Sequence, residues 1–206
     1  MDLSHPAYDL FGRSTARILQ RLAAVNDGLT GRRLSQLAEV SLSSTQRILA
    51  RLENVGLIET QPVGRAVIYS VNRNHLLWTV IDSAFDVTRK VEELVTEIVQ
   101  NYSDVEMTVA LYGSFARGEA GPDSDLDIVV IWLSGMDENT QSAVLGELSE
   151  QLFRATGNSV EIIDLPLPDL QRMATENDPL VASWKREAKT LTQGPDLREL
   201  LKLVAA

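Results

Sequence analysis

The chain has no cysteine and only two histidines, His5 and His75, among its 206 residues. Without thiols it cannot form disulfide bonds, thiolate zinc sites or cysteine nucleophiles. The two histidines lie far apart in the sequence and do not indicate a histidine-rich metal centre. Several common kinds of catalytic and structural site are therefore absent.

Long hydrophobic runs are also lacking. The longest, such as residues 128–133, are far shorter than the ~20 residues that span a bilayer. The N-terminus has neither the charged start nor the apolar core of a signal peptide. We therefore expect a cytoplasmic protein with no membrane partner. The hydrophobic fraction of 44% is ordinary for a globular chain, and 206 residues fit one large or two small domains.

Lysine is missing from the first 75 residues, which hold nine Arg against six Asp and Glu, a net charge of +3. The remaining residues hold ten basic and 23 acidic side chains, a net charge of −13. Such a charge difference between the two halves suggests two modules with different partners. No Gly/Pro/Ser-rich linker, low-complexity tract or internal repeat separates them.

The first module has the pattern of three helices followed by a hairpin. The helices are expected at residues 13–26, 32–38 and 44–54, and the strands at 57–60 and 66–71. Thr30 is a candidate N-cap, and Gly56 a C′ glycine. This order resembles a winged helix-turn-helix over about residues 11–74, and we expect a domain at residues 1–75.

The third helix of such a fold enters the DNA major groove. Its exposed side would offer Ser43, Ser44, Thr45, Arg47 and Arg51, and Arg65 at the hairpin tip would meet phosphate or the minor groove. Arginine without lysine suits phosphate and guanine contacts. DNA is therefore one expected partner. A protein-docking or dimerisation role is the alternative, because a domain charge of +3 is modest.

Residues 76–102 have a broad apolar face and predict one long connecting helix. This face is too apolar for a free linker. We expect it to pack on the second domain or to pair with its twin in a homodimer.

The second module, residues 103–206, contains the most informative motif. An alternating apolar strand at residues 105–111 leads into Gly113-Ser114, and Asp125-Leu126-Asp127 begins a second strand. Gly113 allows a sharp turn, and a helix starting near Ser114 would present N–H groups to an anion. Arg117 could bind phosphate bidentately.

Asp125 and Asp127 lie two residues apart on a strand and therefore share one face. Two like charges held together are unfavourable unless a cation neutralises them. Carboxylate oxygens suit Mg²⁺, which completes its shell with water and substrate phosphate. The pattern predicts phosphoryl transfer chemistry that uses a divalent metal.

Gly113-Ser114, ten intervening residues and Asp125-x-Asp127 resemble the signature of the DNA polymerase beta-like nucleotidyltransferase superfamily. The Gly-Ser-x-Ala-Arg-Gly form and the short chain are most similar to the minimal nucleotidyltransferases. This resemblance implies a nucleoside triphosphate (NTP) substrate, two Mg²⁺ ions bound by Asp125 and Asp127, and β- and γ-phosphates held by Gly113, Ser114 and Arg117.

The family uses a third carboxylate on a neighbouring strand. Glu161, in the β-branched run at residues 158–165, is the candidate. The resemblance implies that Glu161 completes one ion's shell and helps to deprotonate the acceptor. Asp164 is the rival, but by parity it lies on the opposite face and ends the strand.

We therefore expect an α+β or α/β chain with a winged helix, a connecting helix and a nucleotidyltransferase domain whose small mixed sheet is flanked by helices. The favoured function is transfer of a nucleoside monophosphate to a hydroxyl acceptor. The alternative is a DNA-binding regulator whose second domain senses nucleotide or only binds a protein partner. Some minimal nucleotidyltransferases combine both as antitoxin-like proteins.

Overall fold

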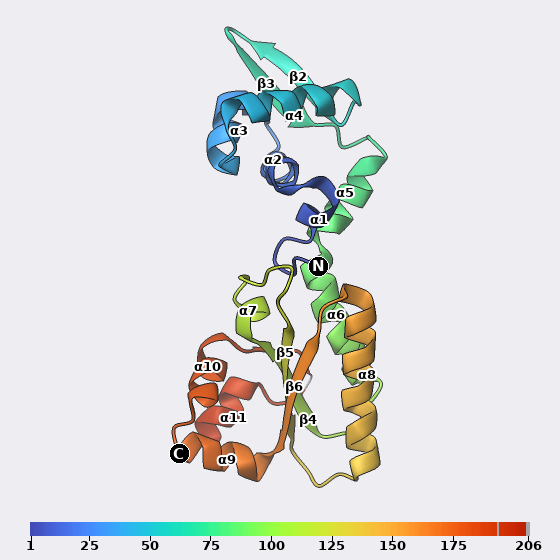
Figure 1. Ribbon diagram of the computed structural model, residues 1–206, viewed down its shortest axis with the longest axis vertical. Coiled ribbons are helices and arrows are strands. Elements are labelled where there is room, and N and C mark those ends of the chain that lie inside the picture. Colours follow the sequence, from blue (N-terminus) through green and yellow to red (C-terminus); the bar gives the residue numbers. More distant parts are fainter. Residues whose placement is uncertain (193, 205–206) are drawn as a thin grey trace. The chain divides into compact units, whose positions relative to one another are not determined.

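The computed structural model describes residues 1–192 and 194–204, which form two compact units (Figure 1). The N-terminal unit is His5–Val87, and the C-terminal unit combines Met1–Ser4 with Thr88–Ala206. The division falls between Val87 and Thr88, inside the segment expected to be one connecting helix.

The N-terminal unit packs five helices against a three-stranded antiparallel sheet of order β1-β3-β2. Its helices are α1 Ala7–Phe11, α2 Arg13–Ala23, α3 Gly31–Ala38, α4 Leu42–Asn54 and α5 Leu77–Phe85. Its strands are β1 Leu29–Thr30, β2 Ile58–Val63 and β3 Ala66–Val71. The shared core includes Ile18, Leu22, Leu34, Leu49 and Trp78. The predicted three helices and hairpin are all present.

Side-chain caps set where α3 and α4 begin. The Thr30 hydroxyl accepts a hydrogen bond from the Arg33 backbone N–H, as expected for an N-cap. Ser41 caps α4 in the same way, accepting from the Ser44 N–H at 3.2 Å. These two caps fix the short link between the helices of the helix-turn-helix.

The expected single helix over residues 76–102 is wrong. The chain forms α5 and then α6 Val87–Gln100, with the break at Asp86. Trp78 and Ile81 of α5 pack into the N-terminal core, whereas Val91 and Val95 of α6 pack into the C-terminal core. The apolar face is continuous in sequence, but its two halves are buried in different units.

The C-terminal unit is built on a four-stranded mixed sheet of order β6-β5-β4-β7. The strands are β4 Met107–Tyr112, β5 Leu126–Trp132, β6 Val160–Pro166 and β7 Lys189–Thr190. β5 pairs antiparallel to β4 and parallel to β6. The small mixed sheet flanked by helices is confirmed.

Helices cover both faces of this sheet (Figure 1). Helix α6 and α8 Glu138–Thr156 pack on the face that carries Leu111 and Ile128. On the opposite face, α9 Leu167–Thr175, α10 Pro179–Glu187 and α11 Leu197–Leu203 pack against Tyr112 and Val129. The short helix α7 Gly113–Ala116 follows β4 directly. Side chains that alternate along β4 and β5 therefore enter two separate cores.

The first residues of the chain belong to the C-terminal unit. Leu3 is 1% exposed in its core, and its carbonyl accepts a hydrogen bond from the Thr88 hydroxyl. The buried Asn158 amide donates to the carbonyls of Met1, Pro122 and Ser124 at 2.9–3.3 Å. These bonds fix the loop that leads into Asp125.

We expect Asn158→Ala to lower the free energy of unfolding by roughly 2–3 kcal/mol, because buried carbonyls lose their donor. Urea unfolding, monitored by tryptophan fluorescence, measures this loss of stability. Asn139→Ala, an exposed position in the first turn of α8, is the matched control and should change stability by less than about 0.5 kcal/mol. Equal effects of the two substitutions would contradict the anchoring role.

Across the described residues, no helix is both long enough and apolar enough to span a membrane.

Candidate nucleotide site and DNA-binding face

A glycine turn brings the end of β4 against the start of β5. Gly113 has φ +69°, and a Cβ placed on it would lie 2.0 Å from Asp127 Oδ2. Only glycine allows both this backbone conformation and this close approach. The glycine turn and the Asp127 carboxylate are therefore packed directly against each other.

Ser114 follows in the first turn of α7. Tyr112, the N-cap residue, makes no side-chain capping bond. Among the described residues, the Ser114 hydroxyl has no hydrogen-bond partner, and its carbonyl accepts from the Glu119 N–H at 2.9 Å. The hydroxyl and the first N–H groups of this turn are thus available to a ligand.

Carboxylates from two neighbouring strands lie on the same face of the sheet near this turn. Asp127 on β5 is in register with Glu161 on β6, and Asp125 precedes it by two residues on the same face. Burial, followed by the charges of Glu161 and Asp125, raises the pKa of Asp127 above its ordinary value. Asp164 is on the opposite face, where it accepts a hydrogen bond from Trp132 Nε1 at 2.9 Å.

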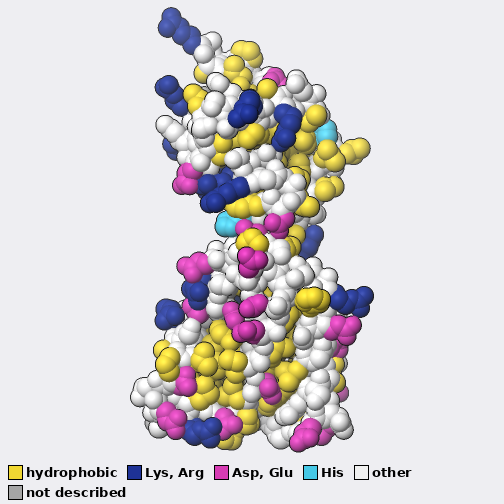
Figure 2. Space-filling model, viewed as in Figure 1, with side chains coloured by type: hydrophobic (Ala, Val, Ile, Leu, Met, Phe, Trp, Pro, Cys, Tyr) yellow, Lys and Arg dark blue, Asp and Glu magenta, His cyan; other side chains and the backbone are white. Residues whose placement is uncertain are grey.

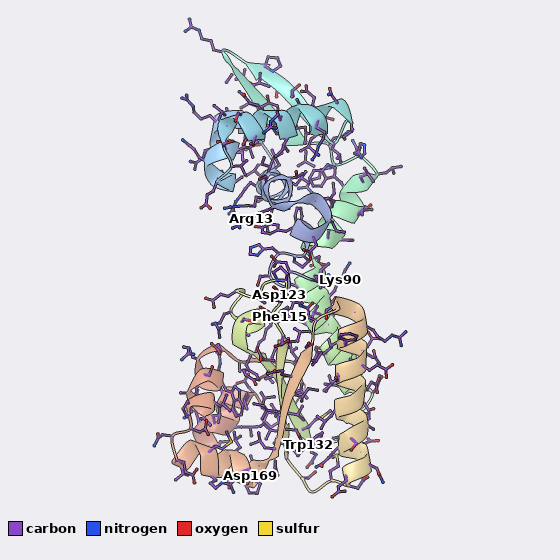
Figure 3. The ribbon with its side chains drawn as sticks, viewed as in Figure 1. Arg13, Lys90, Phe115, Asp123, Trp132 and Asp169 are labelled. Carbon is purple, nitrogen blue, oxygen red and sulfur yellow. The ribbon has the colours of Figure 1, made fainter. Side chains whose placement is uncertain are left out.

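Figure 3 labels residues at both ends of this sheet. Phe115 and Asp123 mark the end where α7 and β5 begin, and Trp132 marks the other end of β5. The carboxylates Asp125, Asp127 and Glu161 therefore occupy the end nearest α7, because β5 and β6 both start there.

Arg117 lies close to these carboxylates, and its charge acts to lower the pKa of Asp127. Two of its nitrogens are already bonded within the unit. Nε donates to Glu119 at 2.7 Å, and Nη1 donates to Glu187 at 2.9 Å. The predicted phosphate-binding arginine is therefore at the site, but it is oriented by two carboxylates.

In the N-terminal unit, α4 presents a polar, basic face. Ser43, Arg47 and Arg51 are exposed, and Ser44 is partly exposed. Arg47 Nη2 donates to the Ser44 hydroxyl at 3.2 Å, and Arg51 Nη2 donates to Thr15 at 3.1 Å. A hollow of about 380 Å³ lies between the two arginines. These four predicted residues share one surface.

Thr45 does not belong to that surface. It is fully buried, and its hydroxyl donates to the Val40 carbonyl at 3.5 Å. Thr45, Leu49 and Leu52 follow the helical repeat of α4 and are all buried, so they form its inward stripe. The prediction that Thr45 contacts DNA is wrong for this reason.

Arg65 is the second residue of a two-residue hairpin turn. Val63 pairs with Ala66, which leaves Gly64 and Arg65 between β2 and β3, and Gly64 has φ +60°. Arg65 is exposed at this tip. Figure 2 shows basic side chains, all arginine, spread over the N-terminal unit and acidic side chains over the C-terminal unit, with one group of them near the end where α7 and β5 begin.

Residues 93–183 match the family model described as polymerase beta, nucleotidyltransferase. Residues 15–62 match the model of the IclR helix-turn-helix domain. The chain joins a helix-turn-helix domain to a nucleotidyltransferase domain. The first match spans Gly113, Ser114, Arg117, Asp125, Asp127 and Glu161.

Crystal structures of a toxin-antitoxin are among the solved structures with similarity to part of the chain. One, described as a toxin-antitoxin with AMP-PNP, is 23% identical and has a TM-score of 0.35, covering 54% of this chain and 80% of its own. Another, described as the toxin-antitoxin MntA-HepT, is 20% identical with a TM-score of 0.35, covering 57% and 80%. No curated protein matches the chain.

The acidic residues of the nucleotidyltransferase domain do not form a complete metal-binding site. Within residues 1–192 and 194–204, no three His, Asp or Glu side chains are placed to hold one ion. Glu161 is exposed, whereas Asp127 is half-buried. The donor set nevertheless fits Mg²⁺, because all donors are carboxylate oxygens and their mutual repulsion is what a divalent cation relieves.

Sequence reasoning missed two residues of the nucleotidyltransferase domain. Glu187, the last residue of α10, has a side chain only 5% exposed. Burial raises its pKa, but hydrogen bonds from Ser183 and Arg117 bring it below the ordinary value. Tyr112 lies beside Asp127, and burial, with the charges of Asp127 and Glu161, raises its pKa to about 12. Neither carries a local motif that could have revealed it.

Proposed function

We propose that this chain catalyses Mg²⁺-dependent transfer of a nucleoside monophosphate from an NTP to a hydroxyl acceptor, with release of pyrophosphate. The observation that carries the proposal is the Gly113 turn built against Asp127, inside the residues that match the nucleotidyltransferase family. Glu161, in register with Asp127 on the next strand, adds the third carboxylate.

Each residue has a distinct role in this proposal. Gly113 and Ser114 present N–H groups and a hydroxyl to the β- and γ-phosphates, and Arg117 adds its guanidinium. Asp125 and Asp127 would hold two Mg²⁺ ions, with Glu161 in the shell of one. When bound, Mg²⁺ neutralises charge on the phosphates and carboxylates.

Glu161 is also the group that would take the proton from the acceptor hydroxyl. It is exposed, so an acceptor can reach it from solvent. Attack by the acceptor oxygen on the α-phosphorus then forms the new P–O bond, and the bond to pyrophosphate breaks. The chain's main contribution to the rate is positioning and charge neutralisation.

Calorimetric titration tests this site directly. ATP, GTP, CTP and UTP are each titrated into the protein with and without Mg²⁺. Mg²⁺-dependent binding supports the site and ranks the bases, and labelled nucleotide then identifies the acceptor. Absence of binding to all four nucleotides would contradict the proposed activity.

A second proposed function is DNA binding by the helix-turn-helix domain, through Ser43, Ser44, Arg47, Arg51 and Arg65. The exposed basic face of α4 favours it. Under this proposal the chain regulates transcription, and the nucleotidyltransferase domain either acts on a partner or senses nucleotide.

We expect the double variant Arg47→Ala/Arg51→Ala to lose at least about 30-fold in DNA affinity, because two groove contacts at roughly 1–3 kcal/mol each are removed. A gel shift with the DNA upstream of the protein's own gene measures this. Arg154→Ala/Arg172→Ala, which removes the same charge from exposed positions of the other domain, is the control. Equal loss in both double variants would indicate non-specific charge attraction.

A further inference from the structure

Arg117 has two carboxylate partners of different character. Glu119, two residues along the same loop, is 65% exposed. Glu187 comes from α10, a distant part of the chain, and its side chain is 5% exposed. Exposed ion pairs hold a side chain weakly, whereas a carboxylate that is itself buried would be left with an uncompensated charge if its partner moved away. Glu187 is therefore the partner that determines where the guanidinium lies.

The carboxylate of Glu187 is itself fixed at both oxygens. Oε1 accepts a hydrogen bond from the Ser183 hydroxyl one helical turn earlier, and Oε2 accepts from Arg117 Nη1 at 2.9 Å. Arg186 also approaches Oε2, at 3.4 Å. A glutamine at this position could still accept from Arg117 and donate to the Ser183 hydroxyl, but it would lack the negative charge that strengthens the bond to the guanidinium.

Helix α10 is a firm support for this carboxylate. Trp184, fully buried, packs edge-on against Tyr112 with ring centroids 5.9 Å apart. Tyr112 is the residue before Gly113 and pairs with Asp127. The helix that carries Glu187 is thus packed on the same strand end that carries the glycine turn.

Arg117 keeps one nitrogen for a ligand. Nε is taken by Glu119 and Nη1 by Glu187, whereas Nη2 has no hydrogen-bond partner among the described residues. The side chain is 38% exposed, and we infer that Nη2 is the nitrogen that a ligand would meet. A long arginine side chain loses much rotamer freedom on binding, unless the free protein already holds it in place.

We propose that Glu187 is a positioning residue that aims the Arg117 guanidinium at the β- and γ-phosphates of the nucleotide. The inference rests on the proposed function and adds to it a residue outside the range that matches the nucleotidyltransferase family. Glu187 does not touch the nucleotide. It acts by keeping Arg117 ready for the part of the ligand that distinguishes a triphosphate from a monophosphate.

The test compares ATP and AMP binding by calorimetry in Mg²⁺. Glu187→Gln should weaken ATP binding about tenfold, the cost of ordering one rotamer-rich side chain, and leave AMP binding within twofold. Glu119→Gln is the matched control, since it removes the exposed partner of the same arginine, and should leave ATP binding within twofold. A merely structural role of Glu187 would weaken both nucleotides equally.

A double-variant cycle separates positioning from other effects. Arg117→Ala should weaken ATP binding, and adding Glu187→Gln to it should cause no further loss. Additive losses would overturn the assignment. Tighter ATP binding by Glu187→Gln would also overturn it, since Glu187 would then compete with phosphate for Arg117.

Circular dichroism checks that Glu187→Gln is folded. If it is not, Ser183→Ala, which loosens the same carboxylate, must show the ATP-specific loss on a smaller, roughly threefold scale, and no loss would overturn the proposal. Native protein that binds none of ATP, GTP, CTP and UTP refutes the proposed function itself, and if another base binds best, its triphosphate and monophosphate replace ATP and AMP in this test. Native binding with unchanged ATP affinity in Glu187→Gln refutes only the positioning role.

Discussion

Asp127→Asn is expected to weaken Mg²⁺-dependent ATP binding by at least about 100-fold and to abolish nucleotide transfer. Loss of a residue that only supports a metal ligand costs about 10- to 100-fold, and Asp127 is proposed as a ligand itself. The amide keeps the size of the side chain and removes its charge. Calorimetry with and without Mg²⁺, together with a labelled-nucleotide assay, measures both effects.

The same substitution should not unfold the protein. Burial and the neighbouring charges of Glu161 and Asp125 raise the pKa of Asp127, so the folded state holds its proton more tightly than the unfolded state. Ionisation of Asp127 therefore destabilises the folded protein as the pH rises through and above the ordinary pKa of an aspartate. At pH 7, Asp127→Asn should be at least as stable as the native chain.

Asp123→Asn is the matched control for this result. Asp123 is exposed in the loop just before β5. Its substitution therefore removes one negative charge near the site but outside it. ATP binding should stay within about twofold of native. Full binding and transfer by Asp127→Asn would refute the proposed mechanism. Equal losses in the two variants would indicate a general charge effect.

The Gly-Ser turn and the Asp-x-Asp motif could be located from the sequence because their parts are close together in the chain. A strand, a glycine turn and an aspartate strand need only local patterns, and the structure has β4 at Met107–Tyr112 and β5 at Leu126–Trp132. Glu161 could be placed by the parity of a β-branched strand, although its approach to Asp127 depends on the parallel pairing of β5 with β6.

Other features depend on tertiary contacts and left no local pattern. The strands β1 and β7 have two residues each, too few for a period of two to be visible. The break at Asp86 is hidden because both helices keep their apolar residues in step. Thr45 has a polar side chain but points inward, where it bonds to a backbone carbonyl. Glu187 reaches Arg117 only through the packing of α10.

Gly113→Ala is the second substitution with a large expected effect, a loss of at least about 100-fold in Mg²⁺-dependent ATP binding. The new methyl group would lie 2.0 Å from Asp127 Oδ2, so the carboxylate must rotate away or the turn must open. Either movement displaces a proposed ligand by an ångström or more, and misplacement of that size can cost about 10²-fold. Calorimetry measures the loss.

Gly118→Ala separates the lost contact from backbone strain. Gly118 has φ +71°, almost the same as the +69° of Gly113, but a Cβ there meets nothing within 4 Å. Both variants should lose about 1–2 kcal/mol of stability from the left-handed conformation, measurable by urea unfolding. Only Gly113→Ala should lose nucleotide binding, because only its methyl group meets Asp127. If both variants lost ATP binding equally, backbone strain in the segment would account for the loss. The close approach of Gly113 to Asp127 would then not be what nucleotide binding requires.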